Sequence, residues 1–106
     1  MAKHHGPFDS LAMKVLSPSQ IDRQLEARPD WRLRRSLLTR TFLFKDFPAA
    51  IRFVSKVAKL AEAAWHHPDI DIRWNRVTLS LTTHDAGGLT RKDFALAGEF
   101  DRIIRR

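Results

Sequence analysis

Three histidines are the residues of this sequence best suited to acid–base chemistry. His66 and His67 stand side by side before Pro68, and His84 follows a stretch of alternating apolar residues. An imidazole can accept or donate a proton near neutral pH, so histidines that converge on one cleft could catalyse proton transfer. Taken singly, each is better explained as an ordinary residue at a helix end or in a loop. Their placement together is what indicates a site.

Two carboxylates could orient these imidazoles. Glu62 lies four residues before His66, so on a helix the two would share a face, either as a tautomer-fixing pair or as a surface pair. Asp93 lies three residues after Thr90, which is the spacing of a capping box at the start of a helix. The Asp93 carboxylate could also orient the ring of His84. Spacing alone leaves the two interpretations of Glu62 open, whereas for Asp93 it favours the capping box, which is compatible with an orienting role.

Other catalytic chemistries find little support in the sequence. The chain has no cysteine, which excludes disulfides, thiolate metal ligands and cysteine nucleophiles. Three histidines and a carboxylate could bind zinc, as in a metal hydrolase, but adjacent histidines on a helix point about 100° apart and suit one ion poorly. No phosphate-cradling glycine-rich loop or nucleophilic serine elbow appears. We therefore expect no metal site.

The composition is that of one small globular domain. The 106 residues carry a net charge of +7, but the basic residues are spread out and no aromatic residues interleave with them. We interpret them as solvated faces and do not expect a nucleic-acid partner. No apolar run is long enough for a membrane span, and the first residues lack a secretory signal. We expect a cytoplasmic protein, and oligomerisation would add buried surface to its small core.

The elements that must position these side chains can be read from periodicity and capping signals. Residues 1–16, which include His4 and His5, are predicted to be a flexible lead-in to a single domain at residues 17–106. The patterns predict a helix from Ser17 to Pro29, one or two strands within residues 31–44, a helix from Asp46 to Pro68, a hairpin at residues 70–82 and a helix from Thr90. This order predicts an α+β two-layer sandwich, with helices on one face of an antiparallel sheet.

Four segments, in order along the chain, match the motifs of a known family. They are F-x-F-x-D-F at residues 42–47, E-x-x-x-H-H-P-[DE] at residues 62–69, N-[KR]-V at residues 75–77 and T-H-x-x-x-G-L-[ST]-x-x-D at residues 83–93. A tryptophan, Trp31, also stands where the family has one. On these motifs the chain resembles the pterin-4a-carbinolamine dehydratases from about Leu16 to its C-terminus.

The resemblance implies a fold, a reaction and a set of site residues. The family fold has three helices on one face of a four-stranded antiparallel sheet. The family reaction removes water from 4a-hydroxytetrahydrobiopterin to give quinonoid dihydropterin, which is hydro-lyase chemistry without a bound cofactor. The residues implied to surround the pterin are His66, His67, His84 and Asp93, with Glu62 as the motif glutamate and Trp31 as a weaker, pocket-side candidate. We assign His66 as the base, His84 as the acid, His67 to shaping the site and Asp93 to orientation.

The resemblance also implies partners. Members of the family commonly form homodimers or homotetramers, and their substrate comes from an aromatic amino acid hydroxylase. Some relatives act instead as dimerisation cofactors of a transcription factor or as assembly chaperones, and the chaperones have lost the histidine signature. Because the signature is intact here, we favour the enzyme and keep the non-catalytic role as the alternative.

Overall fold

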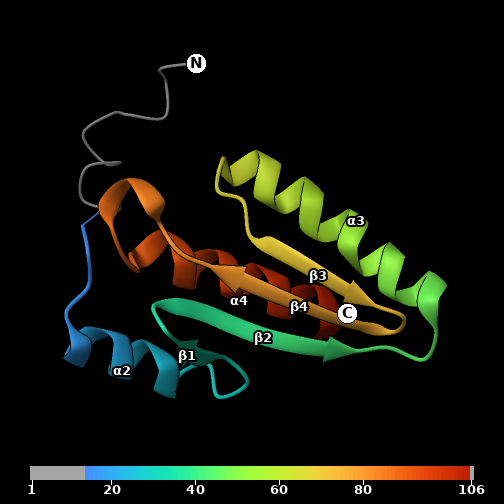
Figure 1. The fold of residues 1–106 in the computed structure, drawn as a ribbon, viewed down its shortest axis with the longest axis horizontal. Helices are drawn as coiled ribbons and strands as arrows, with labels where there is room; N and C mark the ends of the chain where they lie inside the picture. The colour runs from blue at the N-terminus through green and yellow to red at the C-terminus, as the bar shows by residue number, and fades with distance from the viewer. Residues whose placement is uncertain (1–13, 106) are drawn as a thin grey trace.

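A four-stranded antiparallel sheet, covered on one face by helices, forms the framework of the protein (Figure 1). The computed structural model describes residues 14–105, and α4 crosses behind β4 in Figure 1 while α3 runs along the β3 side of the sheet. The elements are α2 (Pro18–Glu26), β1 (Arg32–Arg34), β2 (Leu37–Leu43), α3 (Phe47–Ala64), β3 (Asp69–Arg73), β4 (Arg76–Leu81), the 3₁₀ helix η2 (His84–Ala86) and α4 (Arg91–Arg105). The strand order is β1-β2-β4-β3. The predicted α+β class is confirmed.

Two of the helices begin where the capping signals placed them. The Ser17 hydroxyl accepts a hydrogen bond from the Gln20 N–H, and the Gln20 side chain accepts one from the Ser17 N–H, which completes a capping box before α2. The Asp46 carboxylate accepts from the Ala49 N–H at 2.9 Å before α3. A proline in the first turn of each helix fits because its missing N–H would have no helical partner there.

Two tight turns set the register of the sheet. Arg35 and Ser36 both have positive φ, at 56° and 96°, between the paired residues Arg34 and Leu37. Positive φ at both central positions is the pattern of a type I′ hairpin turn. The second hairpin turns at Trp74, where φ is 53°. Of the one or two strands expected within residues 31–44, the structure has two, and the hairpin expected at residues 70–82 turns at Trp74, which is 68% exposed.

The core lies between the helix-covered sheet face and helices α3 and α4. Its fully buried side chains come from β2, β4 and both helices, and the largest are Phe94, Phe100, Leu38, Leu79 and Leu81. Arg40 is a charged residue on the same face of β2 as the buried Leu38 and Phe42. The structure accounts for it, because the Arg40 guanidinium lies 4.2 Å from the centroid of the Phe42 ring and donates to Asp101 at 2.6 Å.

The predicted lead-in falls mainly on residues 1–13, including His4 and His5, which lie outside the described part of the chain. Of its last residues, the Leu16 N–H donates to the Leu89 carbonyl at 2.9 Å, just before α4. The domain boundary at residue 17 stays a prediction.

Candidate active site

The end of α3 turns the two adjacent histidines away from the helix axis. Trp65 adopts the left-handed conformation, with φ 52° and ψ 43°. The His66 N–H donates to the Ala61 carbonyl and the Trp65 N–H to the Glu62 carbonyl, the bond pair of a Schellman motif. The helix therefore ends at Ala64, four residues before Pro68, where we predicted its end. His66 and His67 belong to the connection that leads to β3.

This ending changes the partner of Glu62. We predicted that Glu62 and His66 would pair on one helix face, but the left-handed residue breaks the helical spacing before His66. The Glu62 carboxylate instead lies 2.8 Å from Nε2 of His67. The Glu62 and His67 side chains are 68% and 53% exposed, so water screens this pair. Glu62 thus holds an imidazole, though not the predicted one.

Asp93 connects the three segments that make up the site. Its side chain is fully buried, and its Oδ1 lies 2.6 Å from Nε2 of His66. Its Oδ2 accepts hydrogen bonds from the Thr90 N–H at 2.9 Å and from the Thr83 hydroxyl at 2.8 Å. The capping-box interpretation of Asp93 is supported by the bond to Thr90. The expected partner ring was His84, and the imidazole that Asp93 holds is that of His66.

The hydrogen bonds around Asp93 fix the direction of each proton. Because the Thr83 hydroxyl donates to the carboxylate, the Thr90 hydroxyl, 2.8 Å away, must be the donor to Thr83. An ionised carboxylate only accepts, so Nε2 of His66 carries the proton shared with Asp93. In a neutral ring, Nδ1 of His66 would then be the unprotonated nitrogen. The contact with Asp93 therefore favours one tautomer of the imidazole.

His84 lies on a short loop that the same network supports. The Thr83 N–H donates to the Gly88 carbonyl, and Gly87, with φ 83°, closes η2 through its N–H to the Thr83 carbonyl. His84 is exposed, and within residues 14–105 its side chain makes no hydrogen bond. Its neighbour Thr83 bonds to the carboxylate that holds His66. Figure 1 shows the end of α3, this loop and the start of α4 at the same end of the molecule.

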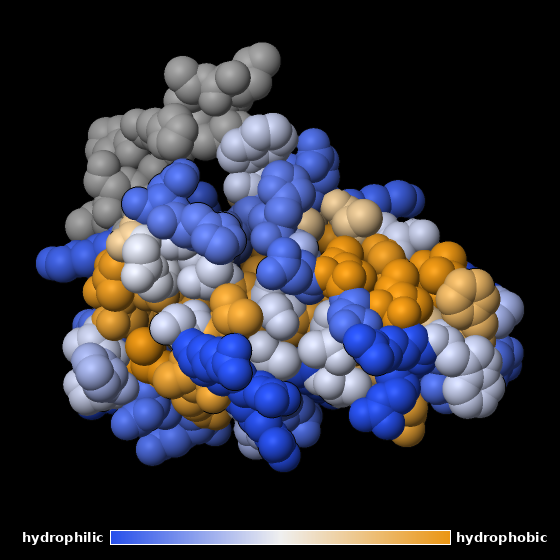
Figure 2. Space-filling model, viewed as in Figure 1, coloured by the Kyte–Doolittle hydropathy of each residue, from blue (hydrophilic) through white to orange (hydrophobic). Residues whose placement is uncertain are grey.

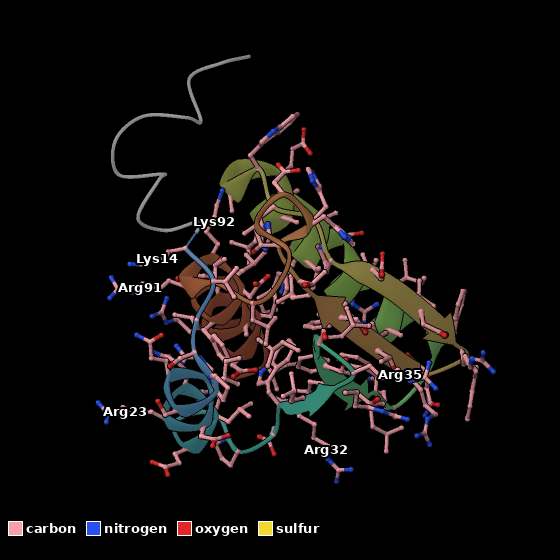
Figure 3. The ribbon with its side chains drawn as sticks, turned by 60° about the vertical axis from the view of Figure 1, so that its left-hand side comes forward. Lys14, Arg23, Arg32, Arg35, Arg91 and Lys92 are labelled. Atoms are coloured by element: carbon pink, nitrogen blue, oxygen red, sulfur yellow. The ribbon has the colours of Figure 1, made fainter. Side chains whose placement is uncertain are left out.

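A small cavity borders the His66 ring. It measures about 200 Å³ and lies between the end of α3 and the first turns of α4, lined by Ala64, His66, Lys92, Ala95, Leu96 and Glu99. The His66 side chain is 11% exposed, so the ring is largely withdrawn from water but still borders open space. Figure 3 shows Lys92 at the start of α4, with Lys14 and Arg91 nearby.

Trp31 belongs to a different set of contacts. It is 3% exposed, and its indole N–H donates to both oxygens of Asp101, at 2.9 and 3.1 Å. Asp101 follows Asp93 by eight residues on α4, a rise of about 12 Å along the helix. The Trp31 ring packs edge-on against Phe42 at 6.1 Å between centroids. These contacts place Trp31 in the core, and its pocket-side role stays a prediction.

One contact of Asp93 was not predicted from the sequence. The buried Thr83 hydroxyl donates to Asp93 and accepts from the Thr90 hydroxyl, yet Thr83 appeared in the sequence only as a letter of a motif. Thr83 and Asp93 are ten residues apart, a spacing that predicts no contact within a helix or a strand, and the loop between them brings the two side chains together. In the part of the chain that the structure describes, no three His, Asp or Glu side chains converge as metal ligands would, and no helix is long and apolar enough to cross a membrane.

Comparisons with known proteins agree on one family. The family described as pterin 4 alpha carbinolamine dehydratase matches residues 14–103. A protein of Chloroflexus aurantiacus that bears the family's name is 63% identical over 92 residues, which cover 87% of this chain and 99% of the relative. One from Acidobacterium capsulatum is 51% identical over 92 residues, covering 87% of this chain and all of the relative.

Solved structures show the same fold. The transcriptional coactivator/pterin dehydratase of Brucella melitensis superposes with a TM-score of 0.82 at 34% identity, over 85% of this chain and 98% of its own. A pterin dehydratase-like RuBisCO assembly factor of the alpha-carboxysome superposes at 0.60 with 23% identity, over 70% of this chain and 88% of its own, a likeness of fold alone. The motifs, the sheet topology and these matches lead to one conclusion: the chain belongs to the pterin-4a-carbinolamine dehydratase family.

Proposed function

We propose that this protein dehydrates 4a-hydroxytetrahydropterin to quinonoid dihydropterin and water, as a hydro-lyase that acts through histidines. The observation that carries the proposal is the contact between His66 and the buried Asp93. In a neutral ring with its proton on Nε2, Nδ1 would be the nitrogen that can accept a proton, and the His66 side chain borders a cavity. A general base needs a defined tautomer and a fixed ring, and the Asp93 network supplies both.

The proposed reaction moves two protons. Nδ1 of His66 takes the proton from N5 of the pterin, and His84, as imidazolium, protonates the 4a-hydroxyl as the C4a–O bond breaks. The N5 electron pair forms the new double bond to C4a, and water leaves. His66 ends protonated and His84 neutral, so exchange with solvent restores both. The exposure of His84 suits that exchange.

The remaining predicted residues have supporting roles in this proposal. His67, held by Glu62 at 2.8 Å and 5.5 Å from the Trp65 ring, would border the pterin from the outer side of the site. Asp93 is a positioning residue, because it acts through His66. Trp31 would act only through the core that it shares with β2 and α4.

The test is the dehydration rate of 4a-hydroxytetrahydropterin in a stopped assay, after subtraction of the uncatalysed rate. Removing one acid–base partner should lower the rate by about 10²–10⁴-fold, which we expect for His66→Ala and for His84→Ala. We expect a smaller decrease for His67→Ala, the graded comparison, because its ring is half exposed. Wild type and His66→Ala at equal rates, with both folded by circular dichroism, would refute the proposal.

A non-catalytic role is the second candidate, favoured by one relative. The Brucella melitensis protein is described as a transcriptional coactivator as well as a pterin dehydratase. A wild-type protein that leaves the dehydration rate at its uncatalysed value would favour this role. For the enzyme, we propose a homodimer or a homotetramer, and analytical ultracentrifugation can measure the number of subunits. We also propose that it lies in the cytoplasm, where an aromatic amino acid hydroxylase would supply its substrate.

A further inference from the structure

The sheet face that carries no helix is polar and rich in hydroxyls. Opposed residues of neighbouring strands share a face, and on this face Thr39 lies opposite Ser80 and Thr41 opposite Thr78. The oxygens of the two pairs are 3.2 and 2.8 Å apart. In Figure 2, paler side chains over β2 and β4 lie between strongly hydrophilic ones over β1 and near the β3–β4 hairpin. This face is therefore built for polar contacts.

A hollow of about 320 Å³ lies on this face at the β1 side, with several arginines around it. Its lining residues are Asp30, Arg32, Arg34, Thr39, Arg40, Thr41 and Arg76. Arg40 is neutralised by Asp101 at 2.6 Å and by Asp30 at 3.7 Å. The other three arginines form no ion pair with any described residue. Figure 3 shows Arg32 extending away from β1.

We propose that this hollow binds a small phosphate-bearing anion, such as a phosphomonoester or a diphosphate. Three guanidinium groups around one space repel one another unless an anion lies between them. The planar guanidinium donates two parallel hydrogen bonds to a phosphate, and the Thr39 and Thr41 hydroxyls can donate further ones. The volume lies within the range of small-molecule sites.

The charges around the hollow favour a small ligand over a long polyanion. Asp30 stands at its rim, and the same face carries two carboxylates on β3, Asp69 and Asp71, of which Asp71 pairs with Arg73 at 3.1 Å. A nucleic-acid strand crossing the sheet would meet those carboxylates, whereas a compact anion would contact the arginine side alone. The hollow shares no lining residue with the cavity beside His66, so the proposed site is separate from the dehydratase site.

The test is titration calorimetry of the full-length protein with pyrophosphate, at fixed ionic strength. The test variant replaces Arg32, Arg34 and Arg76 with Gln. The control variant replaces Arg23, Arg52 and Arg105 with Gln, which removes the same three charges from exposed positions outside the hollow. We expect binding to weaken by about tenfold or more in the test variant and by less than about twofold in the control.

Two further measurements keep the proposal refutable. A variant with Lys at all three positions of the hollow keeps the charge but loses the planar fork, and it should bind with intermediate affinity. All variants should keep the dehydration rate and the melting temperature of wild type. No binding to wild type at millimolar pyrophosphate would overturn the proposal, as would equal weakening in both Gln variants. If the protein instead binds a single-stranded oligonucleotide more tightly per phosphate than it binds pyrophosphate, the proposal is wrong and this face is a nucleic-acid surface.

Discussion

Asp93→Asn is the substitution that should change the tautomer of His66 while keeping the fold around the ring. The amide has the size of the carboxylate, and its oxygen can still accept from the Thr90 N–H and the Thr83 hydroxyl. Its NH₂ group must then face Nε2 of His66. An NH₂ group donates, so the imidazole has to move its proton to Nδ1 in order to accept at Nε2. The proposed base would be lost without removal of a histidine.

The expected magnitudes follow from these contacts. A hydrogen bond to a charged group is worth about 1.5–3 kcal/mol and one between neutral groups about 0.5–1.5 kcal/mol. Two weakened bonds, offset by the easier burial of a neutral group, should lower the free energy of unfolding by about 1–2 kcal/mol. For a domain of this size, that is a decrease of roughly 5–15 °C in melting temperature. The dehydration rate should fall by about 10²–10⁴-fold, the range for loss of a general base.

Asp101→Asn is the matched control. Asp101 is a second buried carboxylate on α4, and it accepts from the Trp31 indole and the Arg40 guanidinium. We expect a comparable loss of stability and a dehydration rate within about twofold of wild type, since its contacts lie about 12 Å along the helix from Asp93. Urea unfolding measures stability, and ¹⁵N spectra of the imidazoles report the tautomer. The proposed role of Asp93 is refuted if His66 carries its proton on Nδ1 in the wild type, or if Asp93→Asn keeps the dehydration rate within about threefold of wild type.

Three further predictions concern local structure. Arg35→Asn combined with Ser36→Gly should raise the free energy of unfolding in urea by about 1 kcal/mol, because both positions have positive φ; an unchanged midpoint would contradict the turn assignment. Asn75→Ala should lower it by about 1–2 kcal/mol, since the Asn75 amide donates at 2.7 Å to the backbone carbonyl after β2, and the dehydration rate should not change. Glu62→Gln should change the free energy of unfolding by less than about 1 kcal/mol, because the ion pair of Glu62 with His67 is exposed to water. A large shift in the melting curve would contradict this screening by water.

Local signals in the sequence predicted most of the framework. The Ser17 and Asp46 caps have their partners within three residues, so the sequence contains both halves of each interaction. The strands expected within residues 31–44 and the hairpin expected at residues 70–82 are also present. Each of these depends on contacts along one helix turn or on one strand, where spacing along the chain determines spacing in space.

The contacts that were missed cross the chain or follow a break in periodicity. Trp31 and Asp101 are 70 residues apart, and no pattern in the sequence pairs an indole with one of twelve acidic residues. Glu62 was assigned to the wrong ring because the spacing rule assumed a helix that continued to His66. A left-handed conformation is usual for glycine at a helix end but uncommon for tryptophan, so Trp65 gave no warning of the stop.

Asp93 can cap a helix and hold an imidazole at the same time because a carboxylate has two oxygens, although the ring is that of His66 and not the expected His84. Oδ2 serves the fold, since it satisfies the first turn of α4 and the Thr83 hydroxyl. Oδ1 serves the site, since it holds His66. The rigid anchoring of one oxygen fixes the direction of the other, so the helix cap itself sets the orientation of the imidazole. Thr83→Val, which removes one anchor of Oδ2 but touches no histidine, should therefore lower the dehydration rate as well as stability, and a loss of stability alone would show that the cap and the site are independent.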